Sequence, residues 1–375
     1  MSERRPSPPA IVSAFRDWLE RLVGSDASDL HLKVGSPPML RVRGQLQRMD
    51  GARLTADHLE QLAGAIVPAQ RRGRFDEEGE VDFAYSLPGV GRFRANVFRQ
   101  RGAVSMVFRK LRLGGPAFED VGLPPAVRSL SEEARGLILV TGPTGSGKTT
   151  TLAAMIEHIN ATRPVHIVTI EDPIEIIYSD KVASVNQREV GQDSRSFLSA
   201  LRAALRQDPD VILIGEMRDT ETVRAALQAA ETGHLVLSTL HTIDAMETVN
   251  RLLDFFPPDQ QKQIRLTLAA TLRGIVSQRL LPAAQGGRVP AIEVLVNTGR
   301  IADRIINPET TSEIPEVMAK GSFYGMQTFD QALVELVKAG RVSVETALEA
   351  ASQPHDLTLA LQQAGLMAVG ARAAG

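Results

Sequence analysis

The sequence predicts an α/β protein in which a smaller α+β domain precedes a larger domain built on a parallel sheet. The first observation is that apolar segments typical of buried strands alternate with helical segments between about residues 137 and 240. The second is that the chain before residue 112 shows one helical segment followed by strands with a period of two. The third is a glycine-rich turn at 142–149, between a strand and a helix.

The composition is that of a soluble globular protein. The chain has 375 residues, enough for two or three domains, and its hydrophobic and charged fractions are 43% and 23%. The net charge of −2 gives no general attraction to nucleic acid or anionic lipid, and the absence of cysteine excludes disulfides and cysteine-ligated zinc. The sequence shows no signal peptide, and no window has the ~18 apolar residues of a membrane helix. We therefore expect a cytoplasmic protein without direct membrane insertion.

The first domain is predicted over residues 11–112, after a Pro- and charge-rich segment at 1–10 that we expect to be disordered. Apolar residues at helical spacing predict a helix over 11–23. From Asp29 the apolar spacing changes to two, which predicts strands. Thr55 can cap a helix between these strands.

A Gly- and Pro-rich segment at 113–125 is the predicted linker to the second domain, at 126–366. Strands are predicted in that domain at 137–140, 166–170, 211–214 and 235–238. Helices are predicted at 149–160, 194–206, 221–230, 260–281, 329–339 and 344–351. The tail at 367–375 is expected to be flexible. Strands separated by helices imply a parallel sheet with ligands at the carboxyl ends of its strands.

The glycine-rich turn matches the nucleotide-phosphate loop G-x-x-x-x-G-K-[ST] at every fixed position. Its glycines free the backbone so that N–H groups point at a β-phosphate, and the helix that follows presents its positive end there. Lys148 would neutralise the β- and γ-phosphates, and the Thr149 hydroxyl would hold Mg²⁺. The loop thus predicts a site for ATP and Mg²⁺. Its candidate residues are Gly142, Pro143, Thr144, Gly145, Ser146, Gly147, Lys148, Thr149 and Thr150.

Acidic residues follow two neighbouring predicted strands. The strand at 211–214 delivers Glu216 to the edge of the sheet that carries the phosphate loop, where a carboxylate can orient an attacking water or accept its proton. The position before it, where an Asp commonly holds Mg²⁺ through water, is Gly215. Mg²⁺ must therefore rely on Thr149, on water and on a carboxylate from elsewhere, for which the acidic segment at 171–175 is the obvious source.

His234 and His241 stand at the two ends of the strand predicted at 235–238. A histidine beside a strand is often only a satisfied turn residue. Both residues are nevertheless close in sequence to a sheet edge that faces the nucleotide, which makes γ-phosphate sensing a candidate role. Neither has the Cys or spaced acid that would complete a zinc site.

The first domain is rich in arginine along strands whose other face is apolar. One interpretation is a solvated face, and the other is a set of arginines that reach a nucleotide held by another domain or subunit. Nucleic acid binding is disfavoured because the aromatic fraction is only 4% and the arginines lack interleaved stacking residues. The arginines in question are Arg92, Arg94, Arg99, Arg101 and Arg109.

Four ordered segments give the chain a resemblance to secretion-type ATPases. Their order matches the Walker A, aspartate, Walker B and histidine boxes of that superfamily, and within it the chain most resembles the type IV pilus retraction ATPases, the PilT and PilU group. The segments at 28–39, 91–98 and 186–191 resemble further parts of that group. The four boxes lie at 142–149, 169–175, 205–219 and 232–242.

The resemblance implies a PAS-like N-terminal domain, a RecA-like P-loop ATPase domain and a homo-hexameric ring. It also implies that Glu216 is the catalytic acid, that Glu175 assists Mg²⁺ together with Thr149 and Glu216, and that Arg92, Arg94 and Arg109 approach the nucleotide across domains. The implied partners are an inner-membrane pilus platform protein and a paralogous retraction ATPase. The implied location is the cytoplasmic face of the inner membrane.

Two segments bear on the direction of work. Assembly and type II secretion ATPases carry a four-cysteine zinc loop where this chain has a short cysteine-free stretch at 281–290, which favours retraction. Retraction ATPases carry an Ala-Ile-Arg-Asn-Leu-Ile-Arg-Glu helix where this chain has 301–308, with altered charges and Pro308 at its end. The segment at 325–332 is closer to the accessory paralogue.

Several functions therefore stay open beside a retraction motor. They are an accessory retraction ATPase with weak hydrolysis, an assembly or secretion ATPase, a non-hydrolysing ring scaffold and, least favoured, a nucleic-acid translocase.

Overall fold

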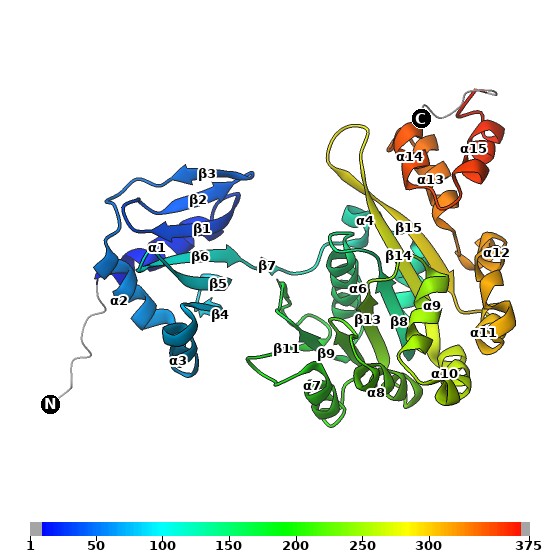
Figure 1. The fold of residues 1–375 in the computed structure, drawn as a ribbon, viewed down its shortest axis with the longest axis horizontal. Coiled ribbons are helices and arrows are strands. Elements are labelled where there is room, and N and C mark those ends of the chain that lie inside the picture. Colours follow the sequence, from blue (N-terminus) through cyan, green and yellow to red (C-terminus); the bar gives the residue numbers. More distant parts are fainter. Residues whose placement is uncertain (1–9, 369–375) are drawn as a thin grey trace. The chain divides into compact units, whose positions relative to one another are not determined.

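Residues 10–368 are described by the computed structural model shown in Figure 1. The chain divides into two compact units, one ending at Leu113 and one beginning at Gly114. The expectations for the two ends of the chain fall largely on residues 1–9 and 369–375, which lie outside the described residues. None of the helices within the described range is long and apolar enough to cross a bilayer.

The first unit is an antiparallel sheet covered on one side by helices. Its strands follow the order β3-β2-β1-β6-β5-β4. Their bounds are β1 Ala27–Lys33, β2 Met39–Val42, β3 Gln45–Arg48, β4 Glu80–Leu87, β5 Gly91–Gln100 and β6 Ala103–Lys110. The two-residue strand β7, Arg112–Leu113, follows β6 in the chain and is not part of this sheet. The helices are α1 Ala10–Val23, α2 Ala56–Ile66 and α3 Ala69–Glu78.

The predicted periodicities explain how this unit folds. The apolar face of α1 buries Phe15 and Leu19 against the sheet, and the period-two residues of β5 and β6, such as Phe93 and Phe108, fill the same core. Thr55 caps α2 as predicted, since its hydroxyl accepts a hydrogen bond from the backbone N–H three residues on. The predicted small α+β domain is therefore observed.

The second unit is a sheet of strands in the order β11-β9-β12-β13-β8-β14-β15, parallel except for β15. The strand bounds are β8 Gly136–Thr141, β9 His166–Glu171, β11 Ser184–Glu189, β12 Val211–Ile214, β13 Leu235–Leu240, β14 Leu272–Pro282 and β15 Arg288–Val296, with a short β10 at Ile176–Ile177. The central strands β8, β12 and β13 are buried along their whole length, which is typical of a sheet covered on both faces.

Helices cover both faces of this sheet and continue into a C-terminal helical cluster (Figure 1). They are α4 Phe118–Val121, α5 Pro125–Ser131, α6 Lys148–Thr162, α7 Phe197–Ala204, α8 Thr220–Glu231, α9 Ala245–Asp254, α10 Pro258–Thr271, α11 Gly299–Ile306, α12 Ile314–Ala319, α13 Phe329–Lys338, α14 Val344–Ala350 and α15 Pro354–Gln363. Two 3₁₀ turns, η1 Pro308–Glu313 and η2 Ser322–Tyr324, flank α12. The predicted strand and helix alternation is therefore correct.

The long helix predicted over 260–281 is wrong. The helix α10 ends at Thr271, and the chain then forms β14, which pairs with β8 on one side and with β15 on the other. The middle of β14, residues 274–278, is buried on both faces, and a strand without a polar face cannot be told from a buried helix by periodicity. The hairpin of β14 and β15 is therefore not predicted by the sequence pattern.

Most of the segment predicted as a linker is folded against the second unit. The Gly114 N–H donates to the Ile177 carbonyl over 2.8 Å, and the Gly115 N–H donates to the Glu157 carboxylate over 3.0 Å. A Cβ on Gly115 would lie 2.3 Å from the Ala153 carbonyl oxygen, so only glycine fits so close to α6. The chain from Gly114 is thereby attached to the helix that follows the phosphate loop.

Candidate nucleotide-binding site

The phosphate loop connects the buried strand β8 to α6. Gly142, Gly145 and Gly147 have φ values of 139°, 81° and 96°, a region that L side chains rarely adopt. A Cβ on Gly142 would also lie 2.4 Å from the Gln278 carbonyl oxygen. Among residues 10–368 no side chain caps the first turn of α6, so its backbone N–H groups stay available to an anion at the positive end of the helix.

Two polar side chains of the loop suit a phosphate ligand. The Lys148 ammonium lies 2.7 Å from the Gly142 carbonyl oxygen and 3.0 Å from that of Pro143, which holds it beside the loop. Burial lowers the pKa of Lys148. The Ser146 hydroxyl is buried at 3% exposure, and within residues 10–368 it has no hydrogen-bond partner. A buried unpaired hydroxyl beside open N–H groups fits an anion-binding loop.

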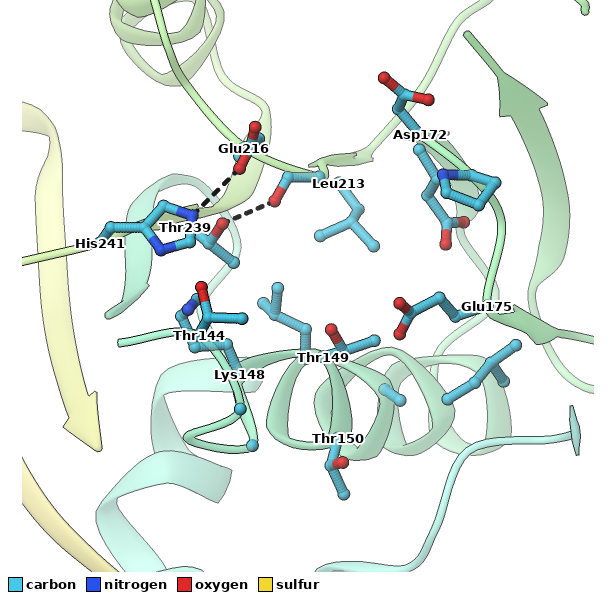
Figure 2. A pocket seen from close by; sticks show the side chains of 18 of the residues that line it. Thr144, Lys148, Thr149, Thr150, Asp172, Glu175, Leu213, Glu216, Thr239 and His241 are labelled. Carbon is cyan, nitrogen blue, oxygen red and sulfur yellow. Dashed lines mark hydrogen bonds and ion pairs between the residues drawn. The ribbon is translucent and has the colours of Figure 1, made fainter. Parts of the chain in front are cut away.

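The loop borders a cavity of about 510 Å³ at the carboxyl ends of the parallel strands. In Figure 2 the side chains of Thr149 and Glu175 face each other across this cavity, and Glu216 and His241 lie at another side of it. Nine of the predicted site residues line it, and they are Thr144, Gly145, Gly147, Lys148, Thr149, Thr150, Glu175, Glu216 and His241. Gly142, Pro143 and Ser146 belong to the loop without lining the cavity.

Glu216 has two basic neighbours at the end of β12. Its Oε2 lies 3.2 Å from His241 Nε2, and its Oε1 forms an ion pair with Arg218. The Glu216 side chain is only 15% exposed. Burial and the cations Lys148 and Arg218 lower the pKa of His241. A neutral imidazole can donate its Nε2–H to the carboxylate, which orients Glu216 toward the cavity.

Two of the acids at 171–175 have different surroundings. Burial raises the pKa of Glu171, although its carboxylate accepts hydrogen bonds from the Thr169 hydroxyl over 2.6 Å and the Gln187 amide over 3.1 Å. Glu175 is exposed at the mouth of the cavity, opposite Thr149. Glu175 is therefore the better candidate for a carboxylate that reaches a ligand.

The oxygen atoms around the cavity suit Mg²⁺ held mainly by phosphate. The part of the chain that the structure describes has no cluster of three or more His, Cys, Asp or Glu side chains arranged to bind a metal by themselves. The Thr149 hydroxyl and the Glu175 carboxylate nevertheless face the same space, and oxygen is the ligand that Mg²⁺ prefers. Thr149 and Glu175 are the residues that would hold Mg²⁺ together with a bound nucleotide.

The structure separates the two predicted histidines. Parallel strands bring the residue after β13, His241, to the cavity, but His234 precedes β13 and lies at the opposite edge of the sheet. His234 Nδ1 lies 2.9 Å from the Ala229 carbonyl oxygen at the end of α8. The expectation that both histidines flank the nucleotide edge is wrong for His234, since strand direction places it one strand length away.

Three predicted arginines share one face of the sheet in the first unit. Arg92 and Arg94 are two residues apart on β5, and Arg109 on β6 is the direct cross-strand neighbour of Arg94. Asp29 compensates this pair of like charges, since its buried carboxylate accepts a hydrogen bond from Arg109 over 2.8 Å. The positions of these three arginines are therefore fixed by the pairing of β5 with β6 and, for Arg109, by its hydrogen bond to Asp29.

Further residues of the cavity were missed by sequence reasoning. They come from segments that reach the edge of the sheet only through the tertiary fold. For Arg218 alone the sequence offers a clue to its place in the cavity, since it is two residues after Glu216. They include Tyr178, Phe197, Arg218, Leu280 and Arg288.

A phosphate loop between a parallel strand and a helix, with a carboxylate two strands away in the sheet, defines a nucleotide-binding protein of the phosphate-loop class. Residues 117–367 match the family described as Type II/IV secretion system protein. The chain belongs to this family.

Relatives of known name align over most of the chain. It is 44% identical over 330 residues to the type IV pilus retraction ATPase PilT of Pseudomonas aeruginosa, which covers 88% of this chain and 96% of that protein. It is 42% identical over 322 residues to a twitching motility protein of Neisseria gonorrhoeae, with 86% of each chain covered. It is 41% identical over 349 residues to the type IV pilus ATPase PilU of P. aeruginosa, with 93% and 91% covered.

Solved structures agree with these alignments. The crystal structure of the pilus retraction motor PilT with bound ADP has 48% sequence identity and a TM-score of 0.83, covering 92% of this chain and 98% of that one. The ATPase DotB of Legionella pneumophila has 28% identity and a TM-score of 0.71, covering 93% and 97%. The predicted resemblance to this group of ATPases is confirmed.

Proposed function

We propose that this chain is an ATP-hydrolysing motor that powers the retraction of type IV pili, and thereby twitching motility. The observation that carries the proposal is the position of Glu216, a shielded carboxylate held by His241 at the end of β12, in the same cavity as Lys148 and Thr149. The similarity to the retraction ATPase PilT, at 44% identity over 88% of the chain, supports retraction as the work that this hydrolysis drives.

Each residue of the cavity has a distinct role in this proposal. The loop N–H groups and Lys148 bind the β- and γ-phosphates. Thr149 and Glu175 would hold the Mg²⁺ ion that accompanies the nucleotide. Glu216 orients the attacking water and accepts its proton, while His241 positions the Glu216 carboxylate. Bound Mg²⁺ supplies neutralisation of the charge that develops on the phosphate oxygens.

Motor action requires more than one domain and subunit. We propose a RecA-like ATPase domain and a PAS-like N-terminal domain, assembled as a homo-hexamer at the cytoplasmic face of the inner membrane, with a pilus platform protein and a paralogous ATPase as partners. Arg92, Arg94 and Arg109 would then approach nucleotide across domains. Gly114 and Gly115 are bound to the ATPase unit, so we expect the rotation between domains to occur outside residues 114–115.

The hairpin connection favours retraction over assembly. The stretch between β14 and β15, residues 283–287, is short and contains no cysteine, whereas the resemblance associates assembly ATPases with a four-cysteine zinc loop there. A specific observation also supports a second candidate, an accessory retraction ATPase with weak hydrolysis. The helix α11 ends at Ile306, just before Pro308, and its charges differ from those of the retraction motif.

The test is to count surface pili in cells whose chromosomal copy carries Glu216→Gln. A retraction motor predicts more fibres than in wild type together with loss of twitching, whereas fewer fibres would assign the chain to assembly. The matched control is Glu231→Gln, an exposed acid at the end of α8, which should leave fibre number and twitching unchanged.

The purified full-length variants separate the enzyme from a scaffold. Glu216→Gln should retain ADP binding and lower ATP turnover by ~10²–10⁴. Near-normal turnover in this variant would remove Glu216 from the mechanism. Slow hydrolysis by the wild-type chain with intact nucleotide binding would favour the accessory role.

A further inference from the structure

The segment that carries Glu175 has the alternation of an extended strand. Ile174, Ile176 and Tyr178 are buried, whereas Glu175 between them is exposed. Successive side chains of an extended chain point to opposite sides, so the buried residues hold the segment in the core and leave Glu175 free of it. In Figure 2 the Glu175 side chain faces Thr149 across the nucleotide cavity.

Two side chains of β11 bind one edge of this segment. Gln187 Oε1 accepts the Tyr178 N–H over 2.9 Å, and Gln187 Nε2 donates to the Ile176 carbonyl over 2.8 Å. Glu189 Oε2 accepts the Ile174 N–H over 3.3 Å. The backbone groups of alternate residues in an extended chain point to the same edge, which is why side chains two residues apart on β11 can reach them.

The contacts of Gln187 fall on both sides of Glu175 in the chain. Besides its two contacts after Glu175, the Gln187 amide donates to the Glu171 carboxylate, before it, over 3.1 Å. The opposite edge of the segment is held by the backbone, since the Ile177 carbonyl accepts the Gly114 N–H over 2.8 Å. Gln187 therefore connects the end of β9 to the short strand β10, with Glu175 between them.

An amide is the side chain that suits this place. It offers two N–H donors, for the Ile176 carbonyl and the Glu171 carboxylate, and an oxygen acceptor for the Tyr178 N–H. An apolar side chain would leave all three groups without this partner, which is costly in a shielded position. Gln187 itself is absent from the lining of the nucleotide cavity.

We infer that Gln187 is the positioning residue for Glu175. Its amide fixes the segment on which the Glu175 carboxylate is held opposite Thr149. This inference rests on the proposed function, in which these two residues would hold Mg²⁺, and it deepens that function by assigning a residue outside the cavity that acts through Glu175. Loss of the amide should therefore weaken the part of nucleotide binding that depends on metal, and spare the part that depends on the phosphate loop.

The experiment measures the affinity of the full-length protein for ADP by calorimetry, once in excess Mg²⁺ and once in EDTA. Gln187→Met keeps the length of the side chain and removes its hydrogen-bonding groups. It should weaken ADP binding about tenfold in Mg²⁺ and leave it within about twofold of wild type in EDTA. The matched control is Gln228→Met, the same change at an exposed position of α8 outside the cavity lining, which should alter neither affinity.

Amide hydrogen exchange gives a second readout that needs no metal. Without nucleotide, residues 174–178 should exchange about tenfold faster in Gln187→Met than in wild type, because the Tyr178 N–H has lost its acceptor. The same residues in Gln228→Met should exchange as in wild type. Unchanged exchange in Gln187→Met would show that Gln187 does not hold the segment, and would overturn the inference.

Glu175→Gln separates this inference from the proposed function. It should lose the Mg²⁺-dependent part of ADP affinity and keep the wild-type exchange of residues 174–178. If Glu175→Gln bound ADP in Mg²⁺ as wild type does, the metal role of Glu175 itself would be overturned. If it lost the Mg²⁺ dependence while Gln187→Met kept it, only the positioning by Gln187 would be overturned. Equal weakening in Mg²⁺ and in EDTA in Gln187→Met would make Gln187 a general support of the fold, which also contradicts the inference.

Discussion

His241 Nε2 and Glu216 Oε2 lie 3.2 Å apart, although the two residues follow different strands, β13 and β12. Parallel pairing aligns these strands so that both side chains emerge at the same edge of the sheet. Lys148 and Arg218 also face this pair, and with burial they keep the pKa of His241 below its usual value. The imidazole is therefore neutral at pH 7 and serves Glu216 as a hydrogen-bond donor.

This relationship predicts the acid limb of the hydrolysis rate. The pKa of His241 is lowered from the ordinary histidine value of 6.5. The imidazole therefore stays mostly neutral down to pH 6.5 and becomes protonated only at lower pH. We expect turnover to be constant between about pH 7 and 8.5 and to fall only at pH values below the ordinary pKa of a histidine, 6.5. His241→Asn, which still donates but does not titrate, should lower turnover about tenfold and move the acid limb to lower pH. Steady-state ATP hydrolysis across this range measures both effects.

The chain contains its own control for this prediction. His234 stands at the opposite end of β13 and is bonded to the last turns of α8, so His234→Asn should give the wild-type pH profile. If His241→Asn kept the acid limb of the wild type, the limb would belong to another group and the pairing would have no part in it.

The close approach of Gly115 to α6 predicts a second effect. In Gly115→Ala the new methyl group would meet the Ala153 carbonyl at 2.3 Å and the Glu157 Cβ at 2.9 Å. The segment must shift away from α6, which should destabilise the ATPase unit by about 1–3 kcal/mol and lower its melting temperature by several degrees. Thermal unfolding followed by circular dichroism gives this value.

Gly299→Ala is the matched substitution. Gly299 begins α11, lies in the same unit and has no atom within 4 Å of the added Cβ, so its melting temperature should stay the same or rise slightly. Equal melting temperatures for the two variants would show that the segment at Gly115 can move away from α6 at little cost in stability.

The parts of the site that sequence reasoning located are those whose chemistry is local. The phosphate loop has its strand, glycines and helix within one short segment, so its position and shape follow from neighbouring residues. Glu216 was also located, because a carboxylate directly after a buried strand must lie at the carboxyl edge. The prediction for His234 is wrong because a residue that precedes a parallel strand lies at the amino edge of the sheet, away from the cavity.

The parts that sequence reasoning missed depend on contacts between distant segments. The strands β14 and β15 are buried along most of their length on both faces, and this leaves no period-two signal. Arg288 appears as an ordinary surface residue until the pairing of β15 with β14 brings it to the cavity. Glu171 and Glu175 look equivalent in sequence, and only burial distinguishes them.

A buried acid away from the cavity gives a prediction for stability. Glu293 on β15 is 7% exposed, and its Oε1 accepts the Ala245 N–H at the start of α9 over 2.8 Å. Burial and the nearby charge of Asp244 raise the pKa of Glu293 to about 7. The unfolded chain loses this proton near pH 4.5, whereas the folded chain keeps it to about pH 7. Stability therefore falls as the pH rises through this window and levels off above it.

Glu293→Gln removes the titration and keeps an oxygen for the Ala245 N–H. The amide can shift the unfolding free energy by a constant amount at every pH. The difference in unfolding free energy, variant minus wild type, should still increase by roughly 3 kcal/mol between pH 4.5 and 7.5. Urea unfolding of both proteins at several pH values measures this difference, with the exposed Glu231→Gln as the control that should show none. A difference independent of pH would mean that Glu293 is ionised in the folded chain throughout, with the N–H groups of α9 and α13 outweighing its burial.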